Sequence, residues 1–200
     1  MEASRAAARA SARARILDAA VQLIAREGIN DVRIARIAMQ AGVSASLLHY
    51  HFASRDSLLA EALEHSYELA GDIRTNLDEQ PREAPERLQW MIDQCLPLPG
   101  SLHDDWMLWV ELWLHAGRRP ELRPTAARLY ARMHEWFSDA IAAGEANGEF
   151  TVNDRARTVD HLLALLDGYG IRALIEDFSI ERAREEIWVA IAPELGFAAA

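Results

Sequence analysis

The chain has no lysine and only one cysteine, Cys95, among its 200 residues. A single cysteine cannot form a disulfide within the chain, so no disulfide framework is expected. No apolar run approaches the ~20 residues of a membrane span, and the Arg- and Ala-rich N-terminus lacks the apolar stretch of a secretory signal. The sequence therefore predicts a soluble, cytoplasmic protein.

The sequence also lacks the motifs by which many enzymes are recognised. It contains no H-E-x-x-H zinc motif, no Gly-rich phosphate loop and no nucleophile elbow. The compact group His103-Asp104-Asp105 resembles a first helical turn, where acids favour the helix dipole. Four histidines could converge on a metal ion, although no spacing supports this: His103, His115, His134 and His161. We therefore expect neither an enzyme nor a cofactor.

Charge is unevenly distributed along the chain, whose net charge is −10. Residues 1–55 hold eight arginines and four acids, a net charge of +4, so the remaining residues carry −14. A basic end on an acidic body concentrates attraction for DNA at that end. Four of the arginines could form an arm that contacts phosphates or the minor groove, or could belong to a disordered tail: Arg5, Arg9, Arg13 and Arg15.

Residues 31–58 predict two short helices joined by a sharp turn. Apolar residues at i, i+3, i+4 and i+7 form the face of the first helix: Ile34, Ile37, Ala38 and Ala41. Gly42 can end it because glycine adopts positive φ without steric cost, and Ser44 can cap the next helix. This is the pattern of a helix-turn-helix, although helical hairpins with a glycine turn also occur in the cores of all-α proteins.

The second helix, from Ser44 to about Tyr50, would direct Leu47 and Leu48 inward. Its outward residues, small enough at the N-terminal end for the backbone to approach base edges, are Ala45, Ser46 and His49. Three residues at and beyond its end can donate hydrogen bonds to phosphates: Tyr50, His51 and Arg55.

Residues 13–63 resemble the N-terminal signature of the TetR family of transcriptional regulators. The matching residues are Ile16-Leu17, Ala19-Ala20, Leu23, Ile37-Ala38, Ala41-Gly42-Val43-Ser44, His51-Phe52, Arg55 and Leu58. The resemblance implies that Ser44 to Leu47 face the bases and that Tyr50, His51 and Arg55 contact the DNA backbone. The chain departs from the family at Arg33 (usually a capping Thr), Ser46 (often Gly) and His49 (often Tyr), so Asp31 is a candidate for the missing cap. The predicted DNA-binding set is Arg33, Ser44, Ala45, Ser46, Leu47, His49, Tyr50, His51 and Arg55.

The remaining sequence predicts helices throughout, with no useful strand pattern and no internal repeat. The expected fold is all-α. A three-helix helix-turn-helix head occupies residues 1–55, with residues 1–12 as a flexible arm, and an effector-binding and dimerisation body occupies residues 56–200. Helices are expected to begin at Ser101, Asp154 and Ser179.

Residues 106–196 resemble, more loosely, the C-terminal body of the choline-sensing BetI-like branch of this family. The matching segments are Trp109-Val-Glu-Leu-Trp113, Pro120-Glu-Leu122, Leu166-Asp-Gly168 and Arg172-Ala-Leu174. The resemblance implies a homodimer built from the last two helices. The first of these is apolar on more than one face and so needs a second partner: Val159, Leu162, Leu163, Leu165, Leu166, Tyr169 and Leu174. The other predicted interface residues are Ile187, Trp188 and Ile191, and a helix central to a monomeric core is the alternative.

Six tryptophans, four of them between Trp90 and Trp113, suggest an aromatic ligand site. The predicted ligand-binding residues are Trp109, Trp113, Met133, Trp136 and Tyr169. An aromatic cage with Glu111 would suit a cation such as a quaternary ammonium, but Glu111 points away from the Trp stripe on an ideal helix. An apolar or aromatic effector is at least as plausible, and Trp at helical spacing is usually core.

The expected function is that of a DNA-binding transcriptional regulator, a repressor released from a pseudo-palindromic operator by a small molecule. Its expected partners are double-stranded operator DNA, an effector of unknown identity and a second copy of the chain, without a membrane. A metal-responsive sensor and a ligand-independent DNA-binding protein are the alternatives.

Overall fold

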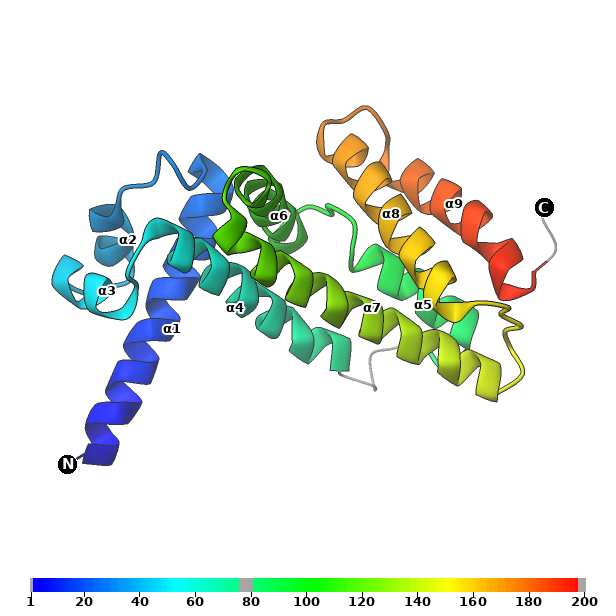
Figure 1. The fold of residues 1–200 in the computed structure, drawn as a ribbon, viewed down its shortest axis with the longest axis horizontal. Coiled ribbons are helices and arrows are strands. Elements are labelled where there is room, and N and C mark those ends of the chain that lie inside the picture. The colour runs from blue at the N-terminus through cyan, green and yellow to red at the C-terminus, as the bar shows by residue number, and fades with distance from the viewer. Residues whose placement is uncertain (1, 76–80, 198–200) are drawn as a thin grey trace. The chain divides into compact units, whose positions relative to one another are not determined.

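The computed structural model describes residues 2–75 and 81–197, and all regular structure in these residues is helical (Figure 1). The helices are α1 (Glu2–Glu27), α2 (Ile34–Gln40), α3 (Ala45–His51), α4 (Arg55–Thr75), α5 (Ala84–Asp93), α6 (Ser101–Arg118), η1 (Pro120–Leu122), α7 (Arg123–Ala146), α8 (Arg155–Leu174), α9 (Ile180–Ile191) and η2 (Ala192–Leu195). The predicted all-α fold is confirmed.

The chain forms two compact units. Of the described residues, the first contains 2–72 and 104–127, and the second contains 73–75, 81–103 and 128–197. Most of α6 therefore belongs to the same unit as α1 to α4, whereas the predicted division of roles places the boundary after residue 55. The division into a DNA-binding head (residues 1–55) and an effector-binding body (residues 56–200) is a prediction about function, which these structural units do not test.

The core of the first unit contains most of the apolar face predicted for residues 34–41, since Ile37, Ala38 and Ala41 are buried. Its largest fully buried side chains are Ile16, Ile24, Ile37, Leu48, Leu58, Leu59 and Leu108. Burying one such side chain contributes about 1.5–3 kcal/mol, so these contacts hold α2 and α3 against α1. Helix α1 ends before Gly28, whose φ of 77° is the left-handed conformation expected of a C-terminal glycine. The helix begins at Glu2, so residues 2–12, predicted as an arm, are helical.

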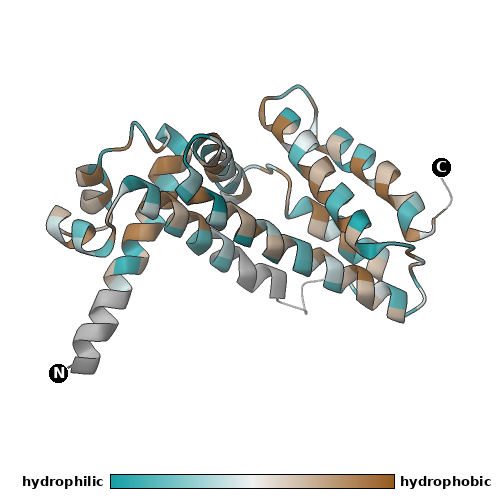
Figure 2. Cartoon of the chain, viewed as in Figure 1, coloured by the Kyte–Doolittle hydropathy of each residue, from teal (hydrophilic) through white to brown (hydrophobic). Residues whose placement is uncertain are grey.

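The core of the second unit joins amphipathic helices, whose brown and teal residues alternate along α8 and α9 in Figure 2. Helices α8 and α9 pack side by side, and α9 also contacts α5. Asp154 caps α8 and Ser179 caps α9, each accepting a hydrogen bond from a backbone N–H three residues later, as predicted.

Several of the predicted dimer contacts lie inside this core. Within the single chain the unit buries Val159, Leu162, Leu163, Leu166, Ile187 and Ile191. These side chains cannot form an outer contact surface without rearrangement, because α8 and α9 use them to pack against their own unit. Leu165, Tyr169, Leu174 and Trp188 remain half-buried.

Candidate nucleic-acid interface and effector region

The turn between α2 and α3 has the predicted geometry. Gly42 adopts a φ of 66°. The Val43 N–H donates to the Ala38 carbonyl at 2.9 Å, and the Ser44 hydroxyl accepts from the Leu47 N–H at 3.2 Å. These local bonds end α2, begin α3 and form the helix-turn-helix.

Helix α3 exposes most of the residues that were predicted to face DNA, but Leu47, which the family resemblance places at the bases, lies on the core-facing side. Leu48 is buried and Leu47 is half-buried, so this side of α3 faces the core. The exposed residues are Ser44, Ala45, Ser46, His49 and Tyr50. A small, exposed N-terminal turn is what a recognition helix needs to enter a major groove.

Arg33 occupies the N-cap of α2, and its side chain forms no capping hydrogen bond. The suggestion that Asp31 supplies the cap is wrong, because among the described residues Asp31 makes no hydrogen bond to the start of this helix. The Arg33 side chain is exposed and has no ion pair or hydrogen bond within the described part of the chain. It is therefore available to contact a phosphate.

His51 fits the predicted phosphate contact less well. Its Nε2 atom is buried and has no hydrogen-bond partner among the described residues. Its ring lies 5.4 Å from the Tyr50 ring and 6.2 Å from the Phe52 ring, measured between centroids. Nε2 cannot reach a phosphate in this arrangement, so a DNA contact by His51 would require the other nitrogen or a turned ring.

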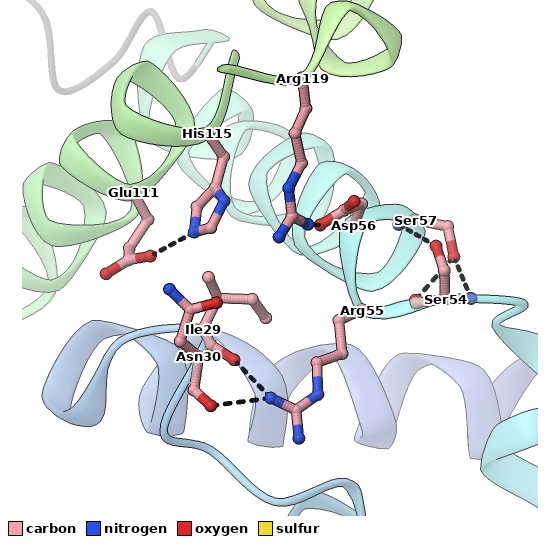
Figure 3. Close-up of polar contacts among 9 residues, drawn as sticks. All are labelled: Ile29, Asn30, Ser54, Arg55, Asp56, Ser57, Glu111, His115 and Arg119. Atoms are coloured by element: carbon pink, nitrogen blue, oxygen red, sulfur yellow. Dashed lines mark hydrogen bonds and ion pairs between the residues drawn. The ribbon is translucent and has the colours of Figure 1, made fainter. Parts of the chain in front are cut away.

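Arg55 contributes to the fold in addition to its predicted role. Its Nη1 atom donates to the carbonyl of Asn30 at 2.8 Å and lies 3.5 Å from the carbonyl of Ile29 (Figure 3). These bonds connect the start of α4 to the turn after α1. The hydroxyls of Ser54 and Ser57 each accept a hydrogen bond from the other's backbone N–H, at 3.0 and 3.1 Å, which fixes the first turn of α4.

The arginines nearest the predicted arm are engaged within the head. Arg13 forms an ion pair with Glu61, and its guanidinium lies 5.8 Å from the centre of the Phe52 ring. The Nε atom of Arg15 donates to the Ala41 carbonyl at 3.1 Å. The prediction that Arg13 and Arg15 extend toward DNA as an arm is therefore wrong in this structure, and the side chains of Arg5 and Arg9 lie outside the described residues.

The predicted ligand-binding residues fall into two groups. In the first unit, the half-buried rings of Trp109 and Trp113 lie 6.0 Å apart, measured between centroids. In the second unit, Met133, Trp136 and Tyr169 pack against the core. The Trp136 ring stands edge-on to Trp90, at 6.4 Å. Trp90 was not among the predicted ligand-binding residues, although its position in the run of tryptophans was a signal that it lies near them.

Glu111 points away from the tryptophans, as its position on an ideal helix predicted. Its Oε1 atom lies 2.9 Å from the place where a Cβ on Gly28 would be, and its Oε2 atom lies 3.3 Å from Nε2 of His115 (Figure 3). Glu111 is therefore engaged at the end of α1, and the suggested cage of tryptophans with this carboxylate is not formed.

A second carboxyl group, which the sequence analysis did not single out, lies in the second unit. Asp167 on α8 is half-buried and accepts a hydrogen bond from the Tyr130 hydroxyl at 2.6 Å. Burial raises the pKa of the Asp167 carboxyl, and the Tyr130 hydrogen bond opposes this by a smaller amount. No arginine or histidine pairs with it among the described residues. An acid in this setting favours a positively charged neighbour.

Neither a metal centre nor a membrane helix is found in the described ranges. No three His, Cys, Asp or Glu side chains there are grouped so as to hold a metal ion. Likewise, no helix in these ranges combines the length and apolarity needed to cross a bilayer.

Both resemblances seen in the sequence are confirmed by comparison with known proteins. Residues 16–62 match the family model described as bacterial regulatory proteins, tetR family, and residues 84–192 match the model described as BetI-type transcriptional repressor, C-terminal. The BetI regulator of Brucella anthropi is 31% identical over 164 residues, which cover 80% of each chain.

Solved structures of similar proteins agree with this assignment. A TetR-family regulator from Rhodococcus sp. has a TM-score of 0.83 and 31% identity, covering 94% of this chain and 100% of the other. A transcriptional regulator from Saccharomonospora viridis, crystallised with choline, has a TM-score of 0.79 and 33% identity, covering 90% of this chain and 96% of the other. The family consists of transcriptional regulators rather than enzymes. The chain therefore belongs to the TetR family and is a DNA-binding transcriptional regulator with a C-terminal part of the BetI type.

Proposed function

We propose that this regulator is a homodimeric repressor that binds a pseudo-palindromic operator and leaves it when a small cation of the quaternary ammonium class binds. The observation that carries the proposal is the capped, exposed N-terminal turn of α3, from Ser44 to Ser46. Such a protein works where the chromosome is, so the cytoplasm is its proposed location.

The division of roles on the head follows from exposure. Ala45, Ser46 and His49 face the bases, because they are exposed and lie on or next to the first turns of α3. The remaining N–H groups of Arg55, together with Arg33 and Tyr50, contact phosphates on either side. Base contacts then select the operator, while phosphate contacts supply most of the affinity and its salt dependence.

The outer face of α8 supports a dimer. Ala164, Gly168, Ile171 and Ile175 follow one another at helical spacing, and Ile175 is 68% exposed. On α9, Val189 is 54% exposed. Small and apolar side chains left outside the core can be buried against the same face of a second copy. Two heads held in this way would read half-sites about 34 Å apart, or a multiple of a helical turn.

The effector class rests on the relative that was crystallised with choline and on residues of this chain. In the second unit, the partly exposed ring of Trp136 can attract a quaternary ammonium through its face. Asp167 supplies a carboxyl group without a cationic partner among the described residues. An apolar effector is the second candidate, because the same ring is largely hydrophobic surface.

The experiment begins with genomic fragments captured by the purified protein, from which an operator duplex is made. Sedimentation should give a dimer that binds this duplex, and choline chloride should weaken the complex while an equal concentration of sodium chloride does not. Ile175→Arg, compared with the exposed control Ala131→Arg, should separate the dimer and abolish operator binding. A strictly monomeric protein, or no preference for any duplex at moderate salt, would refute the proposal. Release by Zn²⁺ or by no small molecule would favour the metal-responsive or ligand-independent alternative.

A further inference from the structure

Helix α6 contacts the DNA-binding head at two places within the first unit. Near its middle, the Glu111 carboxylate lies directly over Gly28, at the end of α1. At its end, Arg119 forms an ion pair with Asp56, in the first turn of α4 (Figure 3). Residues 111 and 119 are about 12 Å apart along a helix, so α6 meets the head at both ends of this span.

The two places are connected through the head itself. The turn that begins at Gly28 continues through Ile29 and Asn30, whose carbonyls lie within reach of Arg55. Arg55 stands next to Asp56, the partner of Arg119. The contacts therefore form a closed ring, which runs from α6 to the α1–α2 turn, then to the start of α4, and back to α6. We call this ring the head joint.

Two buried polar atoms of the head joint, on Glu111 and His115, make no hydrogen bond to any described residue. The side chains of Glu111 and His115 are only 15% and 6% exposed. Their Oε2 and Nε2 atoms are 3.3 Å apart, yet neither has a hydrogen-bond partner in the described residues. Glu111 also places a carboxylate at the negative end of the α1 dipole. A buried carboxylate and imidazole that contact each other without a hydrogen bond are costly, and a structural requirement at this place would explain why they are kept.

The position of the α1–α2 turn matters because the chain runs from this turn directly into α2 and α3. Only three residues, 31–33, separate Asn30 from α2, and α2 leads directly through the Gly42 turn into α3. A change in the turn is therefore passed to α2 and α3 with little chain to absorb it. The start of α4 forms the other attachment of α3, through Phe52 and Ser54.

We infer that Glu111, His115 and Arg119 are positioning residues for DNA reading, which hold the α1–α2 turn and the start of α4 so that α3 is presented at the angle an operator requires. The inference rests on the proposed DNA binding but not on the identity of the effector. It assigns to α6 a role in operator affinity that exists in the absence of any ligand.

The test uses the full-length protein without effector. Glu111→Ala and Arg119→Ala should each weaken operator binding about tenfold and leave random-duplex binding and its salt slope within twofold, because no phosphate-binding cation has changed. Amide hydrogen exchange in residues 28–33 should become faster. Glu111→Gln, which keeps the contact with Gly28, should stay within threefold of the parent. The charge exchange Asp56→Arg with Arg119→Asp should restore most of the affinity that Arg119→Ala loses.

Arg118→Ala is the matched control, because Arg118 is an exposed neighbour on α6 with no ion pair among the described residues. It should leave operator binding and exchange unchanged. The inference is overturned if Glu111→Ala and Arg119→Ala bind the operator like Arg118→Ala, or if they lose operator and random DNA equally with a lower Tm. If the parent protein binds no operator at all, the proposed function fails. In that case the head joint is refuted separately if amide exchange in residues 28–33 is the same in Glu111→Ala and Arg119→Ala as in the parent.

Discussion

Replacing Arg55 with alanine should have two separate effects, because this guanidinium has two separate tasks. One Nη atom is held by the carbonyls of Ile29 and Asn30, which stabilises the head. The remaining N–H groups of this exposed side chain are proposed to contact a phosphate. Arg33 is a natural comparison, since it is also exposed but has no contact of this kind among the described residues.

The two effects can be estimated from the contacts. A hydrogen bond from a charged donor contributes about 1.5–3 kcal/mol, and the exposure of Arg55 places it at or below the low end, so Arg55→Ala should lower the free energy of unfolding by about 1–1.5 kcal/mol. In a chain of this size the Tm would fall by about 2–5 °C. Loss of one phosphate contact in each head of the proposed dimer should reduce the slope of log K against log salt by about 1.8, so that about twelvefold less affinity is lost between 50 and 200 mM salt.

The assay is fluorescence anisotropy on operator and random duplexes over this salt range, together with thermal unfolding. Arg33→Ala should lower the salt slope by the same amount with an unchanged Tm, and Arg55→Lys should recover binding better than stability, because an ammonium cannot reproduce the guanidinium geometry. An unchanged salt slope in Arg55→Ala would refute the phosphate contact. An unchanged Tm would show instead that the bonds to the turn contribute nothing to stability.

Three further predictions concern specificity, packing and pH. Ser46→Arg should change which operator is preferred, measured by selection from a random library, and equal losses on operator and random DNA would contradict its base-facing position. Gly144→Ala should lower the free energy of unfolding by about 1–3 kcal/mol, because its Cβ would lie 2.3 Å from a Phe150 ring carbon, while Gly117→Ala, with open space around it, should be neutral or stabilising. Since the pKa of Asp167 is raised by folding, the folded state binds more protons, so the stability from this group is full below its unfolded pKa and is lost as pH rises through the folded pKa. Asp167→Asn should therefore raise the Tm at neutral pH more than at pH 4, and equal shifts at both would contradict the raised pKa.

The elements that the sequence predicted well are those that local chemistry determines. Gly42 ends a helix because it adopts positive φ, and Ser44 and Ser179 begin helices because their hydroxyls accept from a backbone N–H three residues ahead. The exposure of α3 followed in the same way, since one buried leucine fixes which side of a short helix faces outward. None of these features depends on a distant partner.

The choice of buried face on α6 could not be predicted from the sequence. Trp106, Trp109, Val110 and Trp113 form the most apolar stripe, yet the buried residues, besides Trp106, follow another stripe: Leu108, Leu112, His115 and Ala116. Both stripes have helical spacing, so the periodicity allows either. The choice is made by packing against helices far away in sequence, which also explains why most of α6 joins the unit of the head.

The engagement of arginines within the head changes how its charge should act on DNA. Arg13 and Arg36 pair with the carboxylates of Glu61 and Glu27, so two of the eight arginines in residues 1–55 carry neutralised charge. A phosphate must compete with those acids before it can use either cation, whereas Arg33 is available without such competition. Counting arginines in the sequence therefore overestimates the number of counterions released on binding. Because the salt slope reports that number directly, a measured slope that approaches the full count of eight per head would show that the ion pairs open on DNA.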